Sequence, residues 1–175
     1  VGFALQTFFQ DIISGIFILI DLTVHVGDII ELDGKVGRVE NITLRTTRAV
    51  TRDNKVLVIP NHKYLTTTLF NWTENDKVTG ESINVGVAYG TDGEKFKKVV
   101  LEIAMQHPDA TKKKEPILLF QDFGDSSLDF TLIVFTENAF KGAMIKSDIR
   151  FAIEKALKRN GIEIPFPQRV IHTPK

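Results

Sequence analysis

Three groups of side chains in this sequence could carry chemistry: the histidines, an Asp-Ser turn and a glycine-rich turn. His25, His62, His107 and His172 are scattered along the chain, without His or carboxylate partners at metal-site spacing, so we interpret them as surface residues. Residues 124–127 read Gly-Asp-Ser-Ser, and no histidine lies near them in the sequence. A tight turn accounts for this segment better than a hydrolase triad does.

The glycine-rich turn spans residues 90–95, which read GTDGEK. A phosphate-binding Walker loop needs four residues between its glycines, then Lys and Ser or Thr, and this segment has neither feature, so we interpret it as a strand-to-helix turn. Glycosylation sequons begin at Asn41 and Asn71, but both lie in predicted strands and are interpreted as structural. The chain has no cysteine, which excludes disulfides, thiolate metal sites and cysteine nucleophiles. We expect no metal, no cofactor and no enzymatic activity.

The charge composition argues against nucleic acid as a partner. The 22 Lys and Arg residues balance 22 Asp and Glu residues, so the formal net charge is zero. A nucleic-acid binder normally carries a clustered basic excess. The 175 residues suffice for one large domain or two small ones with cores of their own.

The first twenty residues predict an apolar helix that lacks the polar face of a soluble helix. Asp11 is the only charged residue in this segment, and residues 12–20 are apolar except for Ser14 and Gly15. A helix of this length measures about 30 Å, enough to cross a bilayer, but its polar residues make it a poor span on its own. A charged residue in the middle of a bilayer normally faces protein or a water-filled cavity. The alternative is a buried interface helix of a soluble oligomer.

Two folded domains are expected after this helix, which together give an α+β fold class. Residues 22–76 predict a small antiparallel β domain, with a hairpin turn at Asp33-Gly34 and a β-branched strand over 66–72. Residues 77–175 predict the β-α-β-β-α-β order of a ferredoxin-like domain, in which 170–172 form the last, short extended element. Thr91 or Asp92 is a candidate N-cap for its first helix, and Gly161 ends its second helix.

Seven segments resemble, in order and spacing, the small-conductance mechanosensitive channel family. The pore-lining helix and β domain of that family are matched by VGFALQ, HVGDIIELDGKVGRVENITLRTTR, NKVLVIPNHKYL and NWT. Its third, α/β domain is matched by VGVAYGTDGEKFKKV, FGDSSLDF and GIEIPFPQ. The resemblance covers nearly the whole chain.

The resemblance implies a channel subunit made of three parts. Residues 1–21 would be the C-terminal part of a pore-lining transmembrane helix, 22–76 an Sm-like β domain and 77–175 the ferredoxin-like domain. Upstream transmembrane helices would sense tension, and a homoheptamer in contact with membrane lipid would release ions and small osmolytes on hypo-osmotic shock. The resemblance places this assembly in a prokaryotic plasma membrane, with the β and α/β domains in the cytoplasm. Because the chain begins with Val, we expect a fragment or a processed chain.

The resemblance also assigns a gate within the helix. Phe3 aligns with the bulky apolar residue that lines the family's pore constriction, and rings of such side chains close a pore by dewetting it. Gly2, Ala4 and Gly15 are small residues that allow close helix packing.

A hinge in this helix is expected at one of two positions. Gln6 matches the position at which the family's pore helix bends. Because Thr7 replaces the glycine that often follows this glutamine, Gly15 is the better candidate for the hinge.

Asp11 needs a polar partner, since a lipid-facing carboxylate is costly. We expect Asn71 to supply an amide donor and Trp72 to supply apolar area against residues 12–19, so that these residues couple the helix to the β domain. The alternative is that Asp11 caps a bent second half of the helix.

A soluble, ring-forming binding module is the main functional alternative. Its β domain could bind RNA in the manner of Sm-type barrels, but the lack of a basic excess and the single tryptophan argue against that. An enzyme that uses the α/β domain is a second alternative. Neither explains why Phe3 and Asp11 occur together in one apolar helix.

Overall fold

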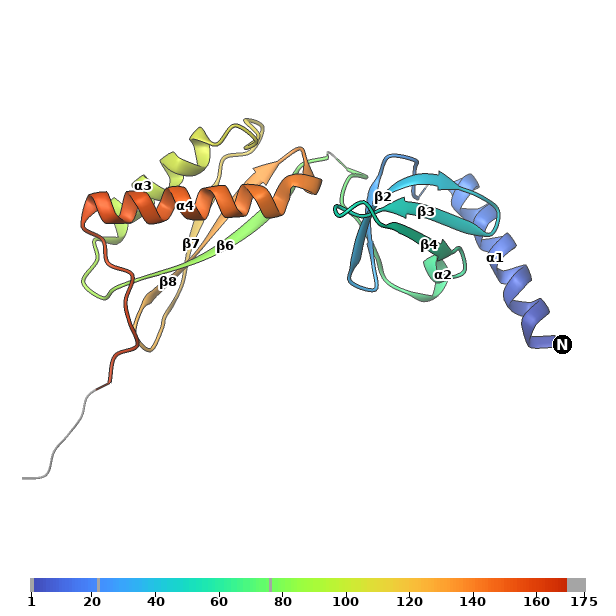
Figure 1. The fold of residues 1–175 in the computed structure, drawn as a ribbon, viewed down its shortest axis with the longest axis horizontal. Helices are drawn as coiled ribbons and strands as arrows, with labels where there is room; N and C mark the ends of the chain where they lie inside the picture. Colours follow the sequence, from blue (N-terminus) through green and yellow to red (C-terminus); the bar gives the residue numbers. More distant parts are fainter. Residues whose placement is uncertain (1, 22, 76, 170–175) are drawn as a thin grey trace, which may run out of the picture. The chain divides into compact units, whose positions relative to one another are not determined.

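The computed structural model describes residues 2–21, 23–75 and 77–169, with side chains from residue 5 onward. The chain divides into two compact units, residues 1–78 and 79–175, which are described separately here (Figure 1).

The first unit begins with the continuous helix α1 (Gly2–Asp21). Its buried residues are Asp11, Ser14, Gly15 and Ile18, which follow the i, i+3, i+4, i+7 spacing of one helix face. The other faces expose large apolar side chains, namely Leu5, Phe8, Phe9, Ile13, Ile16, Phe17, Leu19 and Ile20. Within the described residues, no helix combines the length and the hydrophobicity that crossing a bilayer would require.

Five antiparallel strands complete the first unit in the order β4-β3-β2-β1-β5. They are β1 (Ile29–Leu32), β2 (Lys35–Ile42), β3 (Thr46–Val50), β4 (Val56–Pro60) and β5 (Leu69–Asn71). Asp33 and Gly34 join β1 to β2 with positive φ angles of 50° and 72°, which is the two-residue hairpin turn that the sequence predicted. Ile18 of α1 is buried in the apolar core of this sheet, so the helix is part of the β unit.

A short helix, α2 (Lys63–Thr66), precedes β5 and was not predicted. The expected strand over 66–72 is therefore shorter, because Thr66 ends the helix and only Leu69–Asn71 pair with β1.

The second unit is a three-stranded sheet with two long helices. It contains β6 (Thr79–Val87), α3 (Gly93–Gln106), β7 (Ile117–Phe123), β8 (Leu128–Thr136), the short 3₁₀ helix η1 (Ala139–Lys141) and α4 (Gly142–Asn160). The strand order is β6-β8-β7, and β8 is antiparallel to both neighbours. β6 and β7 are thus parallel and separated by β8, which is the split arrangement of a ferredoxin-like fold.

Both helices of the second unit have the end signals that the sequence predicted. The Asp92 carboxylate accepts hydrogen bonds from the backbone N–H groups of Glu94 and Lys95, and Gly161 ends α4 in the left-handed region at φ 67°. Alternate residues of β8, from Phe130 to Thr136, are buried. A single apolar core therefore joins the sheet to α3 and α4.

The predicted α+β class, with antiparallel sheets and an N-terminal helix, is confirmed. The topology agrees through α4. The last expected element, residues 170–172, lies outside the described residues, as does His172.

Candidate functional site

The contact between α1 and the β unit, called the junction below, forms where the buried stripe of the helix meets the ends of two strands. A Cβ atom added to Gly15 would overlap the carbonyl oxygen of Leu44 and lie 2.7 Å from Nδ2 of Asn61. Only glycine fits at this distance of approach. Gly15 therefore packs closely against the chain's own β unit, whereas its expected role in packing between helices stays a prediction.

Asn61 fixes the loop that faces Gly15. Its side chain is fully buried, its Nδ2 donates to the Thr43 carbonyl at 2.8 Å, and its Oδ1 accepts from the Thr47 hydroxyl at 3.0 Å. Its backbone N–H donates to the Arg45 carbonyl at 2.9 Å. These bonds fix the residues on both sides of Leu44, whose carbonyl faces the helix.

Asp11 is joined to His62 by two hydrogen bonds. Its Oδ1 accepts from the backbone N–H of His62 at 3.0 Å, and it lies 2.7 Å from the His62 Nδ1. The Asp11 side chain is 9% exposed and the His62 side chain is 25% exposed. The carboxylate of Asp11 is therefore hydrogen-bonded within the chain, four residues before Gly15 on the same helix face.

Three expectations are corrected by this geometry. Asn71 is not the hydrogen-bond partner of Asp11; His62 is, because His62 begins the turn after β4 and presents both donors to the helix. His62 is consequently not a free surface residue. Asp11 also does not cap a bent half-helix, since α1 continues without a break from Gly2 to Asp21. Asp11 faces the β unit and has its polar partner there.

Asn71 instead links the segment that follows α1 to strand β5. Its Nδ2 donates to Oδ2 of Asp28 at 2.8 Å and to the Thr23 carbonyl at 3.3 Å. The Asp28 carboxylate also accepts from the His25 N–H at 2.9 Å and from the Thr73 hydroxyl at 3.1 Å. Burial alone would raise the pKa of the Asp28 carboxyl, but these hydrogen bonds outweigh it, so its pKa lies below the usual value.

Two family descriptions match the chain. Residues 7–74 match the β-domain of mechanosensitive ion channels, and residues 81–164 match the C-terminal domain of the mechanosensitive ion channel MscS. Together they cover the whole junction and nearly all of both sheets. The chain belongs to the mechanosensitive ion channel family.

Similar proteins of the mechanosensitive ion channel family come from several microorganisms. An uncharacterized MscS family protein of Archaeoglobus fulgidus is 33% identical over 170 residues, which are 97% of this chain and 59% of that protein. The mechanosensitive channel MscK of Escherichia coli is 34% identical over 171 residues, which are 98% of this chain and 15% of that channel. The closed-state crystal structure of Helicobacter pylori MscS has a TM-score of 0.84 at 29% identity and covers 100% of this chain and 69% of its own. This family member thus spans only part of those relatives.

The remaining predicted site residues of this mechanosensitive-channel chain lie on α1 and at the end of β5. Gln6 is exposed on the helix, which is unbroken both there and at Gly15, so a hinge at either position stays a prediction. The side chains of Gly2, Phe3 and Ala4 lie outside the described ones. Trp72 is half-buried, and its backbone N–H donates to the Ile29 carbonyl at 2.9 Å.

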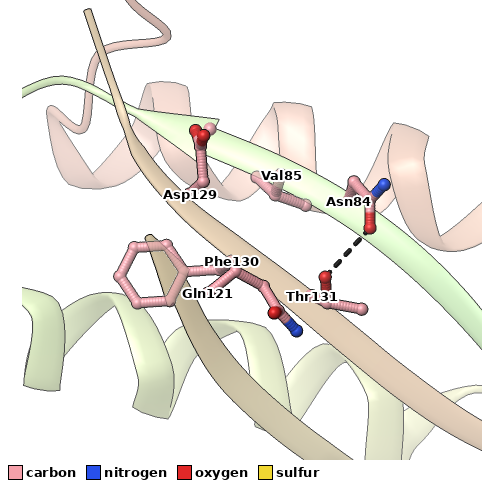
Figure 2. A pocket seen from close by; sticks show the side chains of 7 residues that line it. Asn84, Val85, Gln121, Asp129, Phe130 and Thr131 are labelled. Atoms are coloured by element: carbon pink, nitrogen blue, oxygen red, sulfur yellow. Dashed lines mark hydrogen bonds between the residues drawn. The ribbon is translucent and has the colours of Figure 1, made fainter. Parts of the chain in front are cut away.

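A polar hollow on the sheet of the second unit is a weaker candidate for a binding site (Figure 2). The Thr131 hydroxyl and Oδ1 of Asn84 bond each other at 3.0 Å across it, and the Asp129 carboxylate accepts from Ser127 at 2.6 Å. These groups are satisfied by one another. Among the described residues, no three His, Cys, Asp or Glu side chains converge on a possible metal position.

Proposed function

We propose that this chain is the pore-helix end and cytosolic part of a mechanosensitive channel subunit. The channel would open under membrane tension and release ions and small osmolytes during hypo-osmotic shock. The observation that carries the proposal is the junction: the buried stripe of α1 packs on a family-matched β domain, while the remaining faces of the helix expose apolar side chains. No catalytic role is proposed.

Such a helix surface needs a cover, because a soluble protein rarely exposes a continuous apolar patch of this kind. We propose that copies of the same helix and membrane lipid cover this apolar surface in a homo-oligomeric ring. The ring would have seven subunits, as the family resemblance implies. The ring would lie in a prokaryotic plasma membrane, with the β and α/β domains on its cytoplasmic side.

The proposed gate is a ring of Phe3 side chains. Apolar rings of this type exclude water from a narrow pore, and polar substitution wets them. Gly2 and Ala4 would allow the helices to pack closely around this ring, and Gln6 or Gly15 would be the hinge.

The junction would couple this gate to the cytosolic domains. When α1 moves, either the β domain follows or the Asp11–His62 pair and the contact at Gly15 must break. Tension would then shift the population between two arrangements of the helix, and the strength of the junction would set part of the free-energy difference between them.

Survival of osmotic downshock tests the function. Bacteria without mechanosensitive channels lyse when transferred from high to low osmolarity, so cells that express the full-length protein are expected to survive. Equal lysis with and without the protein, at verified membrane expression, would overturn the proposal.

A further inference from the structure

One end of the second unit carries an extended segment, residues 162–169, called the strap below. It follows α4 and is tied down twice: the Ala88 N–H donates to the Glu163 carbonyl at 2.9 Å, and the Gln168 N–H donates to the Ser126 hydroxyl at 3.0 Å. The first bond places the strap beside the end of β6, and the second places it at the turn between β7 and β8.

The strap presents two apolar side chains to solvent. Phe166 is 77% exposed and Ile164 is 54% exposed, whereas Pro165 between them is half-buried. Pro165 and Pro167 restrict the backbone on both sides of Phe166. A segment that is already extended and anchored loses little conformational entropy when it binds, so it is a pre-organised ligand.

A groove of the same unit has matching chemistry. It lies between the start of α3 and strand β7 and has a volume of about 410 Å³, enough for an aromatic side chain. A row of phenylalanine rings, each with its centroid 4.8 Å from the next, leads outward from the core: Phe96, Phe130, Phe120 and Phe123. Their exposed fractions rise along the row as 0%, 7%, 48% and 69%. We call this site the aromatic groove.

Charges at the two sites are complementary. The groove wall on α3 has an acidic residue, Glu94, and a basic residue, Lys97, while the strap begins with Glu163 and ends with Arg169. Within the described part of the chain, none of these four side chains has an ion-pair partner. Exposed pairs add little affinity, but they fix the register in which two surfaces meet.

We propose that the strap of one subunit docks in the aromatic groove of the next subunit, with Phe166 extending the row of rings. Within one chain Phe166 and Phe123 stay 77% and 69% exposed, so the strap does not fill its own groove and a second copy supplies the contact. A contact between different surfaces of identical chains is heterologous and closes into a ring when the rotation permits it. The inference rests on the proposed ring assembly and identifies a surface that builds it.

Cross-linking between differently tagged chains tests the contact. The 175 residues contain no cysteine, so single cysteines can be placed at will in them. Full-length Phe123→Cys and Phe166→Cys chains, co-expressed and treated in detergent with a short bis-maleimide, are expected to give a covalent dimer that carries both tags. The control pairs Phe166→Cys with Phe151→Cys, since Phe151 is 73% exposed on α4, and is expected to give no such dimer.

Native mass measurement of the same samples separates the possible failures. An intact oligomer in which Phe123→Cys gives no more dimer than Phe151→Cys would overturn the docking contact and leave the proposed channel standing. A protein that is monomeric in detergent would overturn both.

Discussion

At the scale of single residues, the pair formed by Asp11 and His62 is the polar centre of the junction. Asp11 is nearly buried in an otherwise apolar helix, so its carboxylate depends on the two donors of His62. The aspartate could be predicted as a special position, because a lone charge in such a helix needs a partner. The partner could not, since His62 looks like any loop histidine until β4 and α2 place it against the helix.

Removing either partner should destabilise the first unit, and unequally. Asp11→Ala loses both hydrogen bonds and His62→Ala loses only the ring contact, so Asp11→Ala should lower the free energy of unfolding more. One hydrogen bond to a charged group typically contributes about 1.5–3 kcal/mol. The double variant should cost less than the sum of the two. Urea unfolding followed by the fluorescence of Trp72, the single tryptophan, measures these values.

The control for this cycle is Lys63→Ala. It removes a neighbouring ion pair to Asp33, 3.6 Å long and about half exposed, and should change stability little. Strict additivity of Asp11→Ala and His62→Ala would mean that the two side chains do not act together.

The lowered pKa of Asp28 predicts how the stability of the first unit depends on pH. Because its folded-state pKa is lowered, the carboxylate stabilises the fold above its unfolded pKa of about 4, and this contribution is lost as pH falls through the folded value. Asp28→Asn should therefore be less stable than wild type at neutral pH, and the difference should shrink below about pH 4. Thermal unfolding of both proteins at several pH values measures the difference, and a gap that stays constant in acid would contradict this role.

At the scale of elements, local signals predicted most of the fold. The Asp33-Gly34 hairpin, the Asp92 cap and the Gly161 stop each depend on neighbours in sequence, and each was found as expected. The misses have non-local causes. Helix α2 is a single turn too short for a periodic pattern, and Asn71 is bonded to Asp28, 43 residues earlier in the chain.

The close contact between α1 and the sheet predicts the effect of adding one methyl group at Gly15. Gly15→Ala must push the helix away from the Leu44 carbonyl, and such overpacking typically costs about 1–3 kcal/mol. Gly93→Ala is the matched control, because a Cβ there meets nothing within 4 Å at the start of α3. It should be neutral or slightly stabilising. Circular dichroism melts of both variants measure the change, and equal melting temperatures would show that α1 does not rest on Leu44.

At the scale of the whole molecule, the two units perform different tasks in the proposed channel. The first unit fixes α1 through Asp11, Gly15 and Ile18 and would transmit its motion. The second unit presents the strap and the aromatic groove and would join neighbouring subunits. The apolar helix and the resemblance indicated an oligomer, but the docking surfaces could not be predicted from the sequence, because exposed residues such as Phe123 and Phe166 follow no periodic pattern.

Recording from excised membrane patches under suction tests the central claim, that these residues belong to a channel gated by tension. The full-length protein, in membranes that lack other mechanosensitive channels, should give currents that appear above a threshold pressure. Phe3→Ser should lower that threshold, because a hydroxyl wets the constriction, whereas Phe151→Ser on the exposed surface of α4 should leave it unchanged. Patches that contain the protein but show no pressure-dependent current above empty membranes would contradict the account.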